Sequence, residues 1–167
     1  IVRYPAQFQL ILAANPCPCG AEFAQECTCP GAVRARYQAK LSGPLRDRID
    51  IFARTRTTTT ATLTGDTPET SENIAQRVAA ARQRSIARWG QVNATVPGKI
   101  LRAEHPATDE AMIVLQDMLR TKTLTQRGVD RALRVAWTLA DCAGIDKPRL
   151  EHVCDAVALY RDGLEVH

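Results

Sequence analysis

The sequence predicts an α/β segment followed by an all-α helical bundle, and three observations support this fold class. A short apolar run at residues 8–15 ends in Asn-Pro, which is typical of a buried strand that stops at a site. A Thr-rich stretch follows, and from residue 71 onward apolar residues recur at helical spacing. We therefore expect residues 1–56 to end a sheet-containing domain, residues 57–70 to form a linker and residues 71–167 to form the bundle.

Composition and charge narrow the function classes only mildly. Hydrophobic residues make up 45% of the 167 residues and aromatic residues 5%, so the core should consist mainly of Ala, Val, Leu and Ile. A net charge of +4 permits a nucleotide or nucleic-acid partner without requiring one. The sequence shows neither a signal-peptide pattern nor an apolar run near the ~20 residues that span a bilayer. We expect a cytoplasmic protein without a membrane partner and, because the chain does not begin with Met, a fragment of a longer one.

The first half should contain a second strand after a helix. Pro30 can occupy the first turn of a helix over residues 31–41. A turn, a helical turn and a strand around residues 49–54 follow. Two strands are too few for a complete sheet, which agrees with a missing N-terminal portion.

Four helices are expected in the second half, over residues 71–89, 109–121 and 126–144 and after Pro148. Apolar residues repeat along one side of most of them. These residues are Ile74, Val78 and Ala81, then Met112, Leu115 and Leu119, then Val129, Leu133, Ala136 and Ala140, and finally Leu150, Val153, Val157 and Tyr160. The spacing predicts a four-helix bundle.

The helix boundaries carry capping residues. Thr108 and Thr125 are candidate N-caps, whose hydroxyl groups accept hydrogen bonds from helix amides. Gly144 is a candidate C-cap. Residues 90–109, between the first two helices, are expected to form a loop punctuated by Gly and Pro.

Four of the six cysteines form two C-x-C pairs separated by seven residues. They are Cys17, Cys19, Cys27 and Cys29. Four thiolates can make a closed tetrahedral zinc site, which would be structural because no coordination position stays open. A disulfide framework is the weaker interpretation without a secretory signal, and free or partly oxidised cysteines in a loop are the alternative. Cys142 and Cys154 lie at helical core spacing and are expected to be small buried hydrophobic residues.

Three arginines share one expected face of the third helix. Arg127, Arg131 and Arg134 follow i, i+4, i+7 spacing, and Arg127 stands in the first turn. A helix start beside an arginine suits a phosphate group. The alternative is a solvated basic face in which Asp130 pairs with Arg127 or Arg134.

Two further polar residues in the first half are ambiguous when taken singly. Arg48 lies between Asp47 and Asp50, which is typical of a local ion-pair cluster, but an arginine at a subunit boundary can also reach a neighbour's phosphate. Asn15 can belong to an ordinary Asn-Pro turn, or it can orient a water molecule at a nucleotide. The order of these residues along the chain makes the functional interpretation stronger.

Several motifs together resemble the second half of an AAA+ ATPase. The closest resemblance is to the Mg-chelatase-like YifB/ComM family. It rests on "YPAQFQLILAANPCPCG", "CTCP", "RYQAKLSGPLRDRIDI" and "RALRVAWTLADCAG", and it runs from Tyr4 to about Arg161. The resemblance implies a hexameric ATPase that acts on DNA, as a branch-migration helicase in natural transformation. The fold it implies is the end of an AAA+ parallel sheet with a zinc loop, followed by a helical lid.

The same resemblance implies a role for each site residue. Asn15 matches the sensor-1 residue that polarises the attacking water, and Arg48 matches the arginine finger that reaches the adjacent protomer's ATP. Arg127 is our choice for sensor 2, with Arg131 as the fallback. The four cysteines match a cysteine-rich insertion, which favours structural Zn²⁺.

The sequence also departs from the family pattern. Arg46 stands where an apolar residue is more common, and the Thr57–Thr60 run has no explanation. The chain contains neither G-x-x-x-x-G-K-[ST] nor an apolar strand ending in Asp-Glu to hold Mg²⁺. We expect both upstream of Ile1, so that this chain does not hydrolyse ATP by itself and needs the full-length protein to use ATP and Mg²⁺.

Two other function classes stay open. One is the motor subunit of a true magnesium chelatase, which the cysteine loop disfavours. The other is a non-enzymatic zinc module that binds nucleic acid through an arginine-rich helix surface. That surface consists of Arg77, Arg82, Arg84 and Arg88, and its ordinary interpretation is a solvated helix face.

Overall fold

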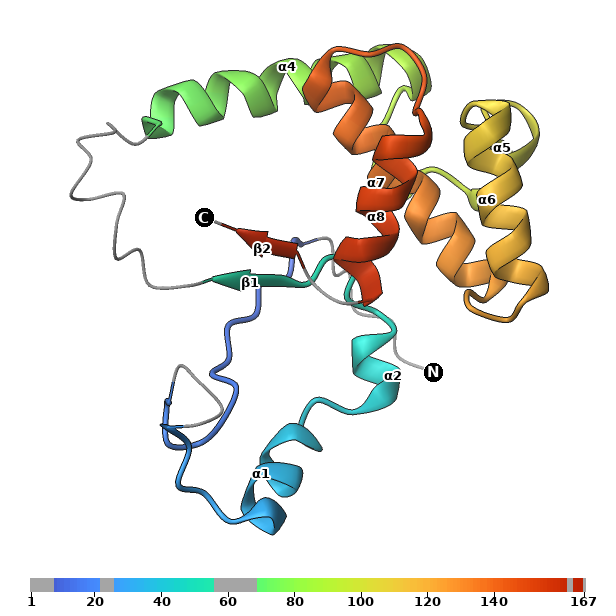
Figure 1. The fold of residues 1–167 in the computed structure, drawn as a ribbon. Helices are drawn as coiled ribbons and strands as arrows, with labels where there is room; N and C mark the ends of the chain where they lie inside the picture. The colour runs from blue at the N-terminus through green and yellow to red at the C-terminus, as the bar shows by residue number, and fades with distance from the viewer. Residues whose placement is uncertain (1–7, 22–25, 56–68, 162–163, 167) are drawn as a thin grey trace, which may run out of the picture. The chain divides into compact units, whose positions relative to one another are not determined.

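The structure, a computed structural model, describes residues 8–21, 26–55, 69–161 and 164–166 (Figure 1). The chain divides into two compact units, residues 1–48 (unit 1) and residues 49–167 (unit 2). The Thr57–Thr60 run and most of the expected linker lie outside the described residues. Among the described residues, no helix combines the length and apolarity that crossing a lipid bilayer requires.

The described part of unit 1 contains two short helices, α1 (Gly31–Gln38) and α2 (Gly43–Arg46). Pro30 is the N-cap residue of α1, one position before the first helical turn where we expected it. Pro44 stands in the first turn of α2, where its missing N–H is not needed. Neither helix buries a residue.

The expected strand at residues 8–15 is wrong, because these residues take no strand conformation. A strand needs a neighbouring strand to pair its backbone groups, and the described part of unit 1 contains none. The apolar side chains of the run are exposed accordingly, with Phe8 at 72% and Ile11 at 82%. The α/β part of the predicted fold class is therefore not formed by this run, and the described chain is mostly helical.

Unit 2 contains one small parallel sheet of two strands in its described part, β1 (Ala53–Thr55) and β2 (Leu164–Val166). Ala53 lies opposite Leu164, and Thr55 lies opposite Val166. The strand expected at residues 49–54 is thus shorter and shifted toward the C-terminus. β2 was not predicted, because a strand of three residues beyond a helix carries no periodic signal.

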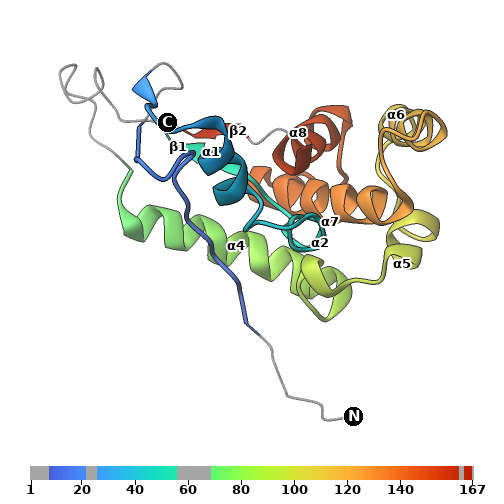
Figure 2. The same ribbon diagram turned by 90° about the horizontal axis from the view of Figure 1, so that it is seen from below.

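The remainder of the described unit 2 is helical. Its elements are α4 (Ser71–Trp89), the 3₁₀ helix η2 (Asn93–Thr95), α5 (Gly98–Ala103), α6 (Asp109–Arg120), α7 (Gln126–Ala143) and α8 (Leu150–Arg161). Helix α7 is central and packs against α4, α5, α6 and α8 (Figure 2). The four expected helices are therefore present.

Helix α5 is a further element of unit 2 that the sequence did not predict. The segment expected to be a loop begins with η2 and then forms α5, which starts after Pro97. Val96 and Leu101 from this segment are 1% and 0% exposed and join the core. Gly and Pro in the segment mark helix starts here, so they were misinterpreted as loop signals.

Thr125, Gly90 and Gly144 cap the ends of helices in unit 2. The Thr125 hydroxyl accepts a hydrogen bond of 3.1 Å from the amide of Gly128. Gly90 and Gly144 end α4 and α7 with φ of 72° and 70°, a conformation that side chains with a Cβ disfavour. Thr108 is the N-cap residue of α6 as expected, but its hydroxyl makes no capping bond.

The apolar stripes of α7 and α8 build the core as predicted. Leu133, Ala136 and Ala140 are completely buried, and Val153 meets them from α8. Partly buried Tyr160 and Leu150 pack against the same cluster. The core therefore follows helical periodicity where two helices face each other.

The stripe expected on α4 is only partly buried. Ala81 is 7% exposed, whereas Ile74 and Val78 are 41% and 43% exposed. The first turns of α4 extend past the end of α7 within unit 2, so no neighbouring helix covers them (Figure 1).

Cys142 and Cys154 are exposed, which corrects the expectation that they are buried. Each follows directly after a buried residue, Asp141 on α7 and Val153 on α8. One residue further along a helix turns the side chain by about 100°, away from the buried face.

Candidate metal centre and arginine sites

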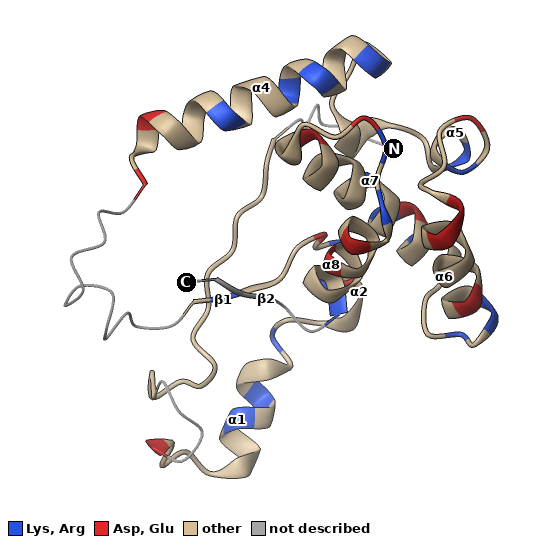
Figure 3. Cartoon of the chain, turned by 45° about the horizontal axis from the view of Figure 1, so that its top comes forward, with Lys and Arg blue, Asp and Glu red and all other residues tan. Residues whose placement is uncertain are grey.

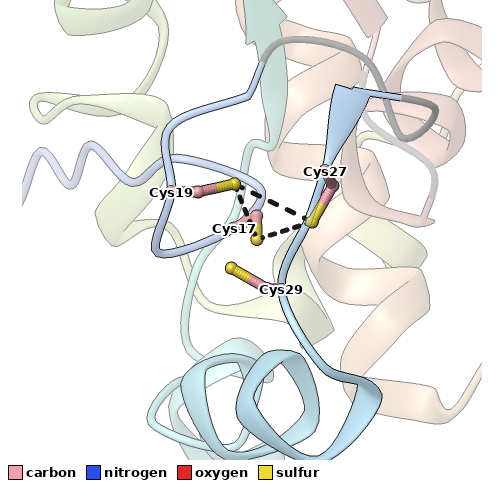
Figure 4. Close-up of side chains that lie close together, drawn as sticks. All are labelled: Cys17, Cys19, Cys27 and Cys29. Atoms are coloured by element: carbon pink, nitrogen blue, oxygen red, sulfur yellow. Dashed lines mark hydrogen bonds between the residues drawn. The ribbon is translucent and has the colours of Figure 1, made fainter.

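The four paired cysteines of unit 1 converge on one point. Their Sγ atoms all lie within 4.8 Å of one another (Figure 4). The Cys17 Sγ lies 3.0 Å from that of Cys27 and 3.4 Å from that of Cys19, and the Cys19 and Cys27 sulfurs are 3.8 Å apart. The two C-x-C pairs are thus brought together from both ends of the loop. This set (Cys17, Cys19, Cys27 and Cys29) is called the cysteine cluster below.

The cysteine cluster fits a single zinc ion. A tetrahedral site with zinc–sulfur bonds of about 2.3 Å has sulfur–sulfur edges of about 3.8 Å. The observed separations surround that value, so small side-chain adjustments suffice. Four sulfur ligands are also the donor set that structural zinc sites use.

Local hydrogen bonds shift the pKa values of two thiols of the cluster, Cys17 and Cys19, in opposite directions. The hydrogen bond with Cys27 raises the pKa of the Cys17 thiol to about 12. Hydrogen bonding from the backbone of Ala21 lowers the pKa of the Cys19 thiol to about 7. Cys19 is therefore the better thiolate of the two near neutral pH, and metal binding has to displace a proton from Cys17.

A tight turn joins the candidate sensor residue to the cysteine cluster. The Gly20 amide donates a hydrogen bond of 3.1 Å to the carbonyl of Cys17, and Gly20 has a φ of +74°. A Cβ at Gly20 would lie 3.7 Å from the Asn15 Nδ2 atom, so the Asn15 side chain lies beside this turn. Asn15 is exposed. The Asn15 side chain thus lies beside the Cys17–Gly20 turn, which carries two of the four clustered cysteines.

Arg48 is exposed at the end of unit 1. Its Nη1 atom donates a hydrogen bond of 2.7 Å to the carbonyl of Pro44, one turn earlier. This bond ties one terminal nitrogen of the guanidinium group to α2, and the residue as a whole is exposed to solvent.

The arginines of α7 do not share one environment, although their spacing predicted a single basic face. Arg127 is exposed in the first turn, where the helix amides also point. Arg131 is 5% exposed, and its Nε atom donates to Asp50 Oδ1 at 2.8 Å. The Cζ atom of Arg131 also lies 4.5 Å from the centre of the Tyr160 ring. The solvated-face interpretation is therefore wrong for Arg131.

Arg134 and Asp130 have partners other than those expected. The Nε atom of half-buried Arg134 donates to the carbonyl of Val96 at 2.9 Å. Asp130 forms its ion pair with Arg102 of α5. A Cβ at Gly98 would overlap the Asp130 carboxylate, so this glycine allows α5 to approach α7 closely. The sequence could not indicate the Arg102 pair, because α5 itself was not expected.

The arginines of α4 that could form a nucleic-acid surface are largely engaged within the chain. Arg84 donates to the carbonyl of Asp141 at 2.6 Å, and Arg88 pairs with the Asp141 carboxylate at 2.6 Å. Arg77 pairs with Glu69 at 3.0 Å. Figure 3 shows the basic residues spaced along α4 rather than gathered at one place. This arrangement supports α4 as a structural helix.

Asp141 is the centre of a buried polar network that our sequence analysis missed. The residue is completely buried, and the Nδ2 atom of Asn93 donates to its carboxylate at 2.8 Å. Ser85 and Trp89 donate to the Asn93 side-chain oxygen at 2.9 Å and 2.7 Å. The available signal was an aspartate at a core position of an amphipathic helix, which requires buried partners.

Two protein-family models match the chain. The model described as magnesium chelatase, subunit ChlI, matches residues 1–63, and the model described as magnesium chelatase, subunit ChlI C-terminal, matches residues 68–161. The second match alone covers more than half of the chain. The two matches lie end to end, in the order that the motifs indicated.

Curated relatives match over nearly the whole chain. An uncharacterized protein of Mycobacterium tuberculosis is 42% identical over 167 residues, which are 98% of this chain and 33% of that protein. Competence protein ComM of Haemophilus influenzae is 30% identical over 162 residues (96% and 32%), and uncharacterized protein YifB of Escherichia coli is 33% identical over 170 residues (99% and 33%). The chain spans about a third of the length of these relatives. The resemblance read from the motifs is thus confirmed, and the chain belongs to the Mg-chelatase-like AAA+ family that includes ComM and YifB.

Proposed function

We propose that this chain supplies sensor and finger residues to an ATP-driven motor of the Mg-chelatase-like AAA+ family. The observation that carries the proposal is Arg48, an exposed arginine within the L-x-D-R-I-D segment of a chain that belongs to this family. An arginine that stabilises charge on a neighbouring subunit's phosphates has to be accessible, and Arg48 is. The chain contributes electrostatic stabilisation, whereas the phosphate-binding loop and the magnesium ligands belong to other parts of the full-length protein.

Three side chains have separate roles in this proposal. Arg48 reaches the ATP of the adjacent protomer, as an arginine finger. Asn15 polarises the attacking water from its position just before the first cysteine of the cluster. Arg127 contacts the phosphates of its own subunit's nucleotide from the first turn of α7. Its exposure supports this choice over the buried Arg131, which was the fallback.

The cysteine cluster has a structural role in the proposal. A bound Zn²⁺ ion, with Cys17, Cys19, Cys27 and Cys29 as its ligands, would hold the loop that follows Asn15. The ion would not take part in ATP hydrolysis, because four sulfur ligands leave no open position.

ATP hydrolysis by the full-length protein tests the finger assignment. Arg48→Ala is expected to leave ATP binding largely intact and to lower turnover by ~10³–10⁵-fold. Arg46→Ala, two residues earlier and also exposed, is the matched control and should retain most of the activity. Near-normal hydrolysis by Arg48→Ala would remove the assignment, and a loss seen only with Arg46→Ala would move it to Arg46.

The partner of the motor is proposed to be DNA, as the resemblance to the YifB/ComM family implies. The full-length protein would then act as a homo-hexamer, as the resemblance to the family implies. DNA-stimulated ATP hydrolysis and displacement of a branched DNA substrate by the full-length protein would support this partner.

A second candidate is the motor subunit of a true magnesium chelatase, which the descriptions of both matching family models favour. The cysteine cluster argues for the ComM type, because these four residues match the cysteine-rich insertion that the resemblance to the YifB/ComM family implies. Stimulation of ATP hydrolysis by a porphyrin, in the absence of stimulation by DNA, would favour the chelatase instead.

A further inference from the structure

Among the ion pairs in the described part of the chain, Arg131 is the most buried arginine, and its partner is Asp50. The Arg131 Nε atom lies 2.8 Å from Asp50 Oδ1, and the two side chains are 6% and 61% exposed. Asp50 belongs to the segment that follows Arg48, whereas Arg131 lies in the second turn of α7, 81 residues later in the chain. The Tyr160 ring of α8 covers the Arg131 guanidinium group from the other side. The arginine thus connects three segments of unit 2.

Two further contacts fix the same segment onto the C-terminal part of the chain. The Phe52 amide donates a hydrogen bond of 2.7 Å to the carbonyl of Leu159, near the end of α8. Directly afterwards, β1 (Ala53–Thr55) pairs with β2 (Leu164–Val166). An ion pair, a backbone hydrogen bond and a strand pair therefore follow one another along residues 50–55. We call residues 50–55 the anchor segment.

We propose that Arg131 is a positioning residue that fixes the anchor segment, and through it Arg48, to helices α7 and α8. Asp50 is two residues after Arg48, and two residues reach at most about 7 Å along the chain. The backbone at Arg48 therefore cannot move far from the site at which Arg131 holds Asp50. The proposal rests on the finger role proposed for Arg48.

The surroundings of Arg131 agree with positioning rather than with phosphate binding. Its guanidinium group is buried, has a carboxylate partner at hydrogen-bond distance and lies against an aromatic ring. A phosphate that bound the Arg131 Nε atom would have to displace the Asp50 carboxylate from it. Arg127, one turn earlier and exposed, is free of that competition. The structure thus gives the two arginines different tasks.

Positioning by Arg131 has a consequence for how the motor would work. Arg127 and Arg131 belong to the same rigid helix, α7, and are one turn apart. A movement of α7 that follows nucleotide binding at Arg127 would carry Arg131, Asp50 and the backbone near Arg48 with it. The position of Arg48 at the neighbouring subunit would then depend on whether nucleotide is bound to its own subunit.

The test uses Asp50→Asn and Arg131→Met in the full-length protein, with ATP as the probe. Both variants are expected to lower kcat at least tenfold and to leave the Kd for ATP within twofold of the parent value. Hydrogen exchange at the Phe52 and Ala53 amides should become at least tenfold faster in both. Asp50→Glu keeps the charge and should restore most of the turnover. Asp117→Asn, which breaks the exposed pair with Arg120, is the matched control and should change none of these values.

The outcomes separate this inference from the finger assignment. Faster exchange with unchanged kcat in Asp50→Asn would overturn positioning while leaving Arg48 as the finger. An ATP Kd raised tenfold in Arg131→Met but not in Asp50→Asn would show that Arg131 binds the nucleotide itself, and it would also overturn the inference. If Arg48 is not the finger, the Arg48→Ala variant would show normal turnover, and none of the other variants would reveal this. If Arg131→Met does not fold, Asp50→Asn decides the matter, since Asp50 is mostly exposed.

Discussion

The interactions that stabilise unit 1 internally differ from those that stabilise unit 2 internally. Unit 2 buries a continuous apolar cluster drawn from α5, α6, α7 and α8, and it adds the buried network around Asp141. In the described part of unit 1, Cys17 is the one buried residue, at 4% exposure. The apolar run of unit 1 lies exposed instead of forming a core. The cysteine cluster is therefore the point around which unit 1 is organised.

This difference indicates that the two units depend on different stabilising factors. Unit 2 resembles an ordinary small helical domain, whose stability comes from burying apolar surface. Unit 1 has too little buried surface for that, so a bound metal or surfaces supplied by other parts of the protein must provide its order. Perturbations of metal binding and of core packing should then affect different units.

The largest expected effect is that of metal removal on unit 1. Structural zinc sites contribute about 10–16 kcal/mol of apparent binding free energy at neutral pH, far more than any single apolar contact in unit 2. We expect about one Zn²⁺ per chain, lost in Cys17→Ser and Cys27→Ser, with hydrogen exchange in residues 26–48 rising to the rate of an unfolded chain. Because the raised pKa of Cys17 opposes its deprotonation, zinc affinity should fall as the pH is lowered.

Retained protection of α7 and α8 after chelation is the internal control for this experiment. Loss of protection in both units together would contradict the separation of the two. Absence of zinc, with four freely reactive thiols, would remove the metal centre and leave only the sensor role of Asn15.

The next effect concerns the buried network of unit 2. Asp141→Ala would leave the Arg88 guanidinium group without its carboxylate partner in a site where its side chain is 18% exposed. Breaking a buried pair by removing one partner costs about 3–5 kcal/mol of unfolding free energy. Urea unfolding followed by tryptophan fluorescence measures this, because Trp89 and Trp137 both border the network. Asp117→Ala, in the exposed pair with Arg120, should cost at most about 1 kcal/mol. Equal costs for the two variants would contradict a special role of burial.

A pair of apolar truncations compares the two units directly. Leu133→Ala removes a completely buried side chain of α7 and should lower the unfolding free energy by about 2–5 kcal/mol. Ile11→Ala removes a side chain of unit 1 that is 82% exposed and should change it by no more than about 0.5 kcal/mol. A large cost for Ile11→Ala would mean that the apolar run is buried in solution, and hence that unit 1 has a core that the described residues do not show.

Periodicity predicted unit 2 well because its helices face one another. The stripes of α7 and α8 fall on buried positions, and Thr125 and Gly144 cap α7 as expected. The same reasoning failed for Ile74 and Val78, since periodicity shows that a face is apolar but not that a neighbour covers it. The prediction of a buried strand at residues 8–15 of unit 1 failed for the same reason.

The candidate site was predictable where its residues are close in sequence. The spacing of the cysteines was enough to predict the cysteine cluster, because a loop of seven residues keeps the two C-x-C pairs close in space. The Asp50–Arg131 pair joins residues 81 positions apart, and its existence depends on how β1, β2 and α8 pack. The spacing of Arg127 and Arg131 places both on one helix face, so their different burial became visible only in the fold.

The smallest expected effect is the loss of stability of unit 2 when one of two N-cap threonines is replaced. Thr125 and Thr108 occupy equivalent N-cap positions, but only the Thr125 hydroxyl accepts a helix amide, that of Gly128 at 3.1 Å. Thr125→Ala should therefore cost about 1 kcal/mol of unfolding free energy. The Thr108 hydroxyl oxygen is buried without a hydrogen-bond partner among the described residues, so Thr108→Ala should cost less than half as much or even stabilise unit 2. Urea unfolding of both variants measures the difference. Equal losses would show that the Thr108 hydroxyl also caps its helix in solution, and that sequence position alone decides the strength of a cap.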